Sequence, residues 1–299
     1  MNGLVEPFAG FFVVFKLPVI TGKHLENRDK LTNKRTNKRT EMVVQSGRFR
    51  RKSVENFIPA RYNKHSSNRK RGALIVKSFT AGGKTITVFS AAEPETPIIY
   101  LNTFSNEGQK VFEAARMLGC PPFTLVAVSD LNWNHDMAPW NSPPAFKNAE
   151  PCTGGADDYL RLLTEQIIPM VENELPCTPK WRGIAGYSLA GLFALYSIYQ
   201  TDRFSRVASM SGSLWFPGIK EYVASHEPKQ QPDCIYFSLG DRESRTRNPM
   251  LKTVGQNTEE IQGFYQARGI DTVFQLNPGN HYDHAAERTA AGICWLLNR

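Results

Sequence analysis

Gly183-Ile-Ala-Gly-Tyr-Ser-Leu-Ala-Gly-Leu-Phe-Ala-Leu-Tyr196 is the stretch of the chain that decides its fold. Its centre fits the pattern Gly-x-Ser-x-Gly, with Gly186 two residues before Ser188 and Ala190 in the last place. Small residues there are a steric requirement of a sharp strand-to-helix turn, because larger side chains would collide across it. A β-rich run precedes the turn and an apolar helix follows it. The sequence therefore predicts a nucleophile elbow with Ser188 as nucleophile, rather than a plain strand–helix connection.

Around this turn the chain alternates strand-like and helix-like segments. Two β-rich runs, 74–79 and 84–90, are joined by Ala-Gly-Gly and predict a hairpin. Further strands are expected at 97–101, 123–128, 181–186, 207–210, 234–239 and 272–276, and helices at 109–118, 157–175, 189–199, 257–268 and 285–297. This alternation predicts one α/β domain over 73–299, with a mostly parallel central sheet and helices on both faces.

The first quarter of the chain has a different composition. Residues 1–72 hold 17 Lys and Arg against 5 Asp and Glu, a net charge of +12, so the remaining residues carry −4 of the total of +8. Few apolar residues recur there at any period, which predicts a disordered leader. A basic arm that binds nucleic acid or anionic lipid is the alternative. The catalytic part itself gives no sign of a nucleic-acid partner.

Hydropathy and cysteine spacing bear on the cellular setting. The longest apolar candidate, residues 8–20, is interrupted by Lys16 and Pro18, and it lacks the basic start and cleavage site of a signal peptide. We expect neither a membrane partner nor secretion. The five cysteines are scattered without a CxxC pair, which fits free thiols in a reducing cytoplasm. The oligomeric state is left open.

A serine nucleophile needs a general base, and in a fold of this kind the order is Ser, acid, His. The stretch Pro278-Gly-Asn-His-Tyr-Asp-His284 follows the last expected strand. His281 comes first, in a Gly-containing loop, and is the expected base. A metal site at His281 and His284 lacks a third ligand at a familiar spacing, so neither metal nor cofactor is expected.

The acid that orients the histidine is expected after the strand 234–239. The loop there reads Gly240-Asp-Arg-Glu243 and offers two carboxylates, Asp241 and Glu243. Spacing does not choose between them, and the unused one would pair with a neighbouring arginine at the surface.

An oxyanion hole needs two backbone N–H groups. One is expected from Leu189, directly after the nucleophile. The other is expected from the loop 102–108, where Phe104 is the first choice by position and Thr103 the next.

The segment 130–144 follows the strand 123–128 and therefore reaches the carboxyl edge of the sheet, where ligands bind. Its aromatic and polar residues are candidates for the substrate pocket, with a loop packed on its own tryptophans as the alternative. The segment 211–216 is expected to form the opposite wall. The candidate substrate-binding residues are Trp133, His135, Asp136, Trp140 and Trp215.

The residues 183–196, taken with Ser209-Met-Ser-Gly-Ser-Leu-Trp-Phe216, resemble the putative-esterase branch of the α/β hydrolases. That branch includes enterochelin, salmochelin and ferri-bacillibactin esterases and the mycolyltransferases. The resemblance covers residues 74–299 and none of the leader. It implies the nucleophile at Ser188, the base at His281 and the acid at Glu243 rather than Asp241.

The resemblance also implies limits. Asn102 and Thr103 stand where the branch has Asp and Gly before the oxyanion residue, which again falls on Phe104. Some siderophore esterases of this branch use a Ser–His dyad, so a dyad stays open. No cluster of Arg or Lys for a triscatecholate–iron anion is evident.

Together these observations predict a metal-independent serine esterase that acts on a small-molecule ester through an acyl-enzyme, in the manner of the siderophore esterases. Two alternatives remain. One is an acyltransferase of the same fold, and the other is a hydrolase-like binding protein without activity.

Overall fold

The computed structural model describes residues 74–299 apart from 92–94 and 176–177. The leader predicted for residues 1–72 lies outside the described residues. Among the helices of the described part, none is long and apolar enough to cross a membrane.

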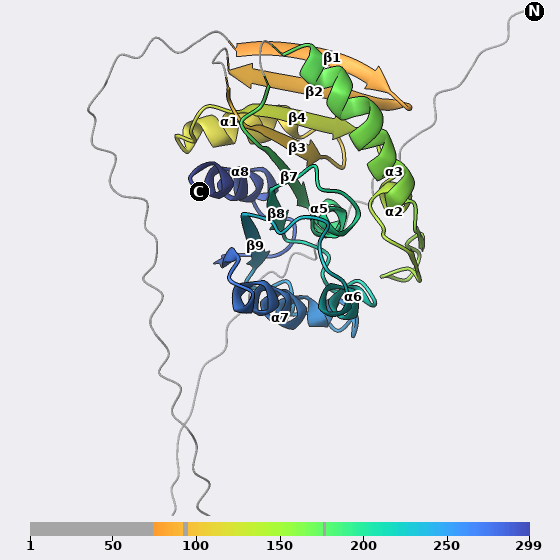
Figure 1. The fold of residues 1–299 in the computed structure, drawn as a ribbon. Coiled ribbons are helices and arrows are strands. Elements are labelled where there is room, and N and C mark those ends of the chain that lie inside the picture. Colours follow the sequence, from red (N-terminus) through yellow and green to blue (C-terminus); the bar gives the residue numbers. More distant parts are fainter. Residues whose placement is uncertain (1–73, 92–94, 176–177) are drawn as a thin grey trace, which may run out of the picture. The chain divides into compact units, whose positions relative to one another are not determined.

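One large sheet organises the described residues (Figure 1). Its order is β1-β2-β4-β3-β7-β8-β9-β10, and β7 therefore lies at the centre. The pairs β1–β2 and β2–β4 are antiparallel, and the others are parallel. The strands are β1 (Leu74–Ala81), β2 (Lys84–Ala91), β3 (Ile98–Asn102), β4 (Thr124–Ser129), β7 (Arg182–Tyr187), β8 (Arg206–Met210), β9 (Cys234–Gly240) and β10 (Asp271–Asn277).

Every strand expected from the sequence is present, and the hairpin joins β1 to β2 as predicted. The strands β3 and β4 are buried along their whole length, which explains why they read as continuous apolar runs. A short antiparallel pair, β5 (Asn141–Ser142) with β6 (Cys152–Thr153), was not predicted. Two-residue strands are too short for a period-2 pattern to reveal them.

Helices cover both faces of the sheet, as the alternation predicted (Figure 1). The helices α1 and α8 pack together against one face. On the other face α5 is buried almost throughout, beside the helical run α3–α4 and the helix α7. The helices are α1 (Gly108–Met117), α2 (Trp133–Asp136), α3 (Ala156–Leu162), α4 (Ile168–Asn173), α5 (Leu189–Gln200), α6 (Ile219–Ser225), α7 (Val254–Ala267) and α8 (Ala285–Leu297), with a 3-10 turn at Leu251–Thr253.

The helix expected over 157–175 is interrupted. A π-helical turn, Leu163–Ile167, separates α3 from α4. Pro169 stands in the first turn of α4, where it removes an N–H and crowds the preceding turn. A wider turn directly before a proline accommodates both effects.

The expectation that all cysteines are free is wrong for two of them. Cys120, just beyond α1, and Cys294 of α8 form a disulfide. Cys152 and Cys234 are free and buried, and Cys177 lies outside the described residues. Sequence spacing missed the pair because 174 positions separate its members and only the packing of α1 on α8 brings them together. Disulfides persist in oxidising compartments, so cysteine usage no longer argues for the cytoplasm.

Candidate active site

Ser188 sits in a strained turn at the end of the central strand. Its φ is 61° and its ψ is −125°, between β7 and α5. The turn is so tight that a Cβ at Gly186 would lie 2.2 Å from the backbone carbonyl group of Ala190. The left-handed backbone lifts the hydroxyl out of the sheet edge, while the carbonyl of Ser188 accepts hydrogen bonds from Leu192 and Ser213 (3.2 and 3.0 Å). The structure thus has the geometry that the small residues of the motif predicted.

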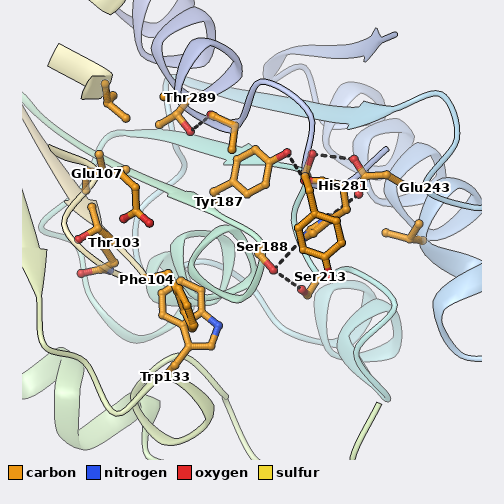
Figure 2. Close-up of a pocket in the computed structure, with 18 of the residues that line it drawn as sticks. Thr103, Phe104, Glu107, Trp133, Tyr187, Ser188, Ser213, Glu243, His281 and Thr289 are labelled. Atoms are coloured by element: carbon orange, nitrogen blue, oxygen red, sulfur yellow. Dashed lines mark hydrogen bonds and ion pairs between the residues drawn. The ribbon is translucent and has the colours of Figure 1, made fainter. Parts of the chain in front are cut away.

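His281 lies beside this serine, in the loop between β10 and α8 (Figure 2). Its Nε2 is 3.0 Å from the Ser188 Oγ, and its Nδ1 is 2.7 Å from the Glu243 Oε2. Three residues from three separate loops therefore form one hydrogen-bonded chain. This is the arrangement in which a histidine can take a proton from a serine while a carboxylate fixes its tautomer.

Of the two carboxylates that the sequence left open, Glu243 is the one that reaches His281. Its side chain is only 4% exposed, and its other oxygen accepts hydrogen bonds from Ser211 Oγ (2.7 Å) and the Gly240 N–H (2.5 Å). Burial alone would raise the pKa of Glu243. The hydrogen bond and charge of His281, with those two donors, outweigh burial and hold that pKa below its usual value. Glu243 is therefore kept ionised and in one orientation.

Asp241 bonds the backbone of the histidine loop rather than the ring of His281. Its Oδ1 accepts a hydrogen bond from the Gly279 N–H at 2.9 Å, and it also faces the guanidinium of Arg242. It joins the loop after β9 to the loop that carries His281, without contacting the imidazole.

A buried arginine, which the sequence analysis did not identify, fixes the loop of His281 through hydrogen bonds to its backbone carbonyls. Arg288 of α8 is 4% exposed and donates to the carbonyls of Asn280 and Pro278, each at 2.9 Å. Tyr187 adds a hydrogen bond from its hydroxyl to the His281 carbonyl (2.7 Å). Arg288 lies on the buried face of α8, where a charged residue is unusual, and that placement was the available signal.

The two expected oxyanion donors flank the serine. Leu189 is the first residue of α5, so its N–H has no carbonyl one turn earlier in the helix. Thr103 donates its N–H to Val128, and Ser105 donates to the Glu107 carboxylate. Phe104 lies between them and donates its N–H to no group in the described part of the chain. Its position therefore fits the second donor better than Thr103 does.

A cavity of about 540 Å³ opens beside Ser188 and His281. Trp133 and Phe104 meet edge to face on one side of it, with ring centroids 5.1 Å apart, and Trp215 lines it as well (Figure 2 labels the first two). Other walls come from α1 and α8. The side chains from these and neighbouring elements are largely apolar, among them Leu101, Val111, Phe146, Leu251, Val254, Ala285 and Ala286.

Three residues predicted for the substrate pocket are not among those that line this cavity. His135 bonds Thr153 (2.7 Å), and Asp136 forms an ion pair with Lys84 (2.5 Å). Trp140 donates to the Pro217 carbonyl (2.8 Å) and packs among Tyr196, Phe216 and Tyr222. The segment 130–144 is thus mainly packed on itself and on the core, and Trp133 alone of its four candidates reaches the cavity. In the described residues no group of His, Cys, Asp and Glu is placed to hold a metal ion.

The fold and this site define an α/β hydrolase. The family model described as "Putative esterase" matches residues 101–285, and the chain belongs to that family of ester hydrolases.

Individual proteins are similar at low identity. The uncharacterized protein YbbA of Bacillus subtilis is 23% identical over 236 residues, which cover 73% of this chain and 94% of YbbA. The siderophore hydrolase EstA of Aspergillus nidulans has a TM-score of 0.57 at 19% identity, over 76% of this chain and 95% of EstA. An IroE-like serine hydrolase of Shewanella oneidensis has a TM-score of 0.60 at 18% identity. The match covers 76% of this chain and 80% of the hydrolase chain. At these identities the two structures support the fold alone.

Proposed function

We propose that this protein is a serine esterase that hydrolyses a small-molecule ester through an acyl-enzyme. The observation that carries the proposal is the chain Ser188–His281–Glu243, with contacts of 3.0 and 2.7 Å at the edge of an apolar cavity. Siderophore esters belong in its substrate panel, because EstA is named a siderophore hydrolase.

In the first half of the reaction, His281 Nε2 takes the proton of Ser188 as Oγ attacks the ester carbonyl carbon. The N–H groups of Leu189 and Phe104 bind the oxyanion that forms, and the N-terminal end of α5 favours the same charge. The bond to the alcohol oxygen then breaks, and His281 gives its proton to the leaving alcohol. The acyl group stays on Ser188 Oγ.

In the second half, His281 takes a proton from water, and the resulting hydroxide attacks the acyl carbon. The bond to Oγ breaks, Ser188 recovers the proton, and the carboxylic acid leaves. Glu243 stabilises the imidazolium in both halves without accepting the proton itself.

The test is hydrolysis of p-nitrophenyl acetate and butyrate by wild type and four variants. Ser188→Ala is expected to lower kcat by at least about 10³-fold. Ser197→Ala removes a buried hydroxyl from α5, the helix that follows Ser188, and is expected to leave kcat unchanged. Among the described residues this hydroxyl bonds the Ala194 carbonyl. If Ser188→Ala retains wild-type turnover, the nucleophile assignment is lost.

The two remaining variants separate a triad from a dyad. Glu243→Gln leaves the ring of His281 without its anionic partner and should lower kcat by about 10²-fold to 10⁴-fold. Asp241→Asn keeps an acceptor for Gly279 and should change kcat little. Equal kcat in Glu243→Gln and wild type would mean that the dyad suffices.

A further inference from the structure

Glu107 brings a free negative charge to the wall of the cavity. Two carboxylates line the space, Glu107 and Glu243. Glu243 is bonded to His281, Ser211 and Gly240 and lies 3.6 Å from the buried guanidinium of Arg288, so its charge is already compensated. In the described part of the chain no Lys or Arg lines the cavity. The charge that a bound molecule meets away from the reacting atoms is therefore that of Glu107.

The Glu107 carboxylate is held in place. Glu107 is half-buried directly before α1, and its two oxygens accept from the Ser105 N–H at 3.2 and 3.1 Å. A carboxylate has about four acceptor positions, so this contact leaves room for a second partner. Figure 2 shows the carboxylate pointing into the space between Thr103 and Tyr187. Its orientation brings the carboxylate to the wall of the cavity, where a ligand can reach it.

Aromatic rings stand in the same cavity. Phe104, three residues before Glu107, is 67% exposed and meets the edge of Trp133. Faces of Trp and Phe attract cations, and more strongly where water is displaced. An anionic group would instead be desolvated in an apolar space beside a like charge, which is unfavourable on both counts.

We infer that this site favours esters that carry a cationic ammonium group, which pairs with Glu107, over neutral esters, and that it disfavours esters that carry an anion. The inference rests on the proposed esterase function and specifies its substrate class. Glu107 acts here as a specificity-determining residue, since it lies apart from the atoms that react.

Matched substrates test this directly. Choline butyrate and 3,3-dimethylbutyl butyrate have nearly the same shape, but only the first is charged. A second pair places the trimethylammonium or tert-butyl group at the end of the acyl chain of a p-nitrophenyl ester. In at least one pair we expect kcat/KM to favour the cation by about fivefold or more, the factor of a partly exposed ion pair. A succinate monoester should be the poorest substrate.

Glu107→Gln isolates the charge from the structural role. Glutamine keeps an acceptor for the Ser105 N–H, so the loop of Phe104 is retained. The preference for the cation should then vanish, through a rise in KM for the charged ester. Glu113→Gln is the matched control, because Glu113 is exposed on α1, the helix that follows Glu107, and accepts a hydrogen bond from Gln109. That variant should keep the preference.

Binding to Ser188→Ala protein gives a readout without turnover. Choline is expected to bind more tightly than 3,3-dimethylbutan-1-ol, and Glu107→Gln should abolish the difference. Equal binding of the two alcohols, together with no preference in either ester pair, would overturn the inference. So would a preference that survives in Glu107→Gln. If wild type hydrolyses no ester while choline still binds through Glu107, the proposed function fails and the charge selectivity stands.

Discussion

The turn that carries Ser188 and the loop that carries His281 meet at one edge of the sheet, but different forces hold them. The conformation of the turn is fixed by steric packing, because Gly186 lies against the backbone of Ala190 and no side chain larger than hydrogen fits there. The conformation of the loop is fixed by hydrogen bonds. Arg288 and Tyr187 donate to its backbone carbonyls, and Asp241 accepts from the Gly279 N–H. The steric constraint on the turn joins residues four apart in the chain, whereas the loop depends on groups from several distant elements.

The strongest way to break the turn is Gly186→Ala. The added Cβ would lie 2.2 Å from backbone atoms of Ala190, and no rotamer change relieves a backbone overlap. We expect a loss of at least about 3 kcal/mol in the free energy of unfolding, measured by urea denaturation. Gly263→Ala, in α7 with nothing within 4 Å of the added atom, should instead gain about 0.5 to 1 kcal/mol. Equal effects at the two glycines would remove the steric explanation.

The loop is tested by Arg288→Met, which keeps most of the side-chain volume but leaves two carbonyls without their donor. We expect a smaller loss of stability, about 2 kcal/mol, since buried acceptors become unsatisfied. Because the loop positions His281, kcat should also fall by about tenfold or more, with KM less affected. Arg288→Lys should restore part of kcat. A stability loss with unchanged kcat would make Arg288 a purely structural residue.

The smallest expected effect is a difference between Glu243→Gln and wild type in how the free energy of unfolding depends on pH. The pKa of Glu243 is lower in the folded than in the unfolded chain, so the unfolded state takes up the proton first as pH falls. The stability that the ionised group contributes is present above its ordinary pKa of 4.5 and is lost as pH falls below it, through the folded value. The unfolding free energy of Glu243→Gln should therefore fall less steeply than that of wild type over this range. Parallel curves for Glu243→Gln and wild type would contradict the assignment.

The contrast between turn and loop also marks what could be predicted from the sequence. The strands of the large sheet, and the positions of Ser188 after β7 and His281 after β10, follow from local patterns that neighbours along the chain impose. The choice of Glu243 over Asp241 did not, because two carboxylates two residues apart differ only in where their loop points them. The role of Arg288 and the Cys120–Cys294 disulfide could not be predicted either, because both depend on contacts between elements that are distant in the sequence.

The segment 130–144 shows a different limit. Its place after β4 brings it to the carboxyl edge of the sheet, but side-chain direction there follows the local backbone, with Trp133 in α2 and Trp140 directly before β5. Trp133 turns toward the cavity, whereas Trp140 turns toward Tyr196 and Tyr222. Aromatic composition alone gives both the same expectation, because a tryptophan serves a pocket and a core equally well.

The disulfide between Cys120 and Cys294 has a topological consequence. It closes the chain from one cysteine to the other into a covalent ring, which contains Ser188, Glu243 and His281. Phe104 and the β1–β2 hairpin lie on the tail that enters the ring. A single cut anywhere inside the ring would leave the three residues of the hydrogen-bonded chain on one covalently connected molecule, and only a second event, reduction of the bond, would let the pieces separate.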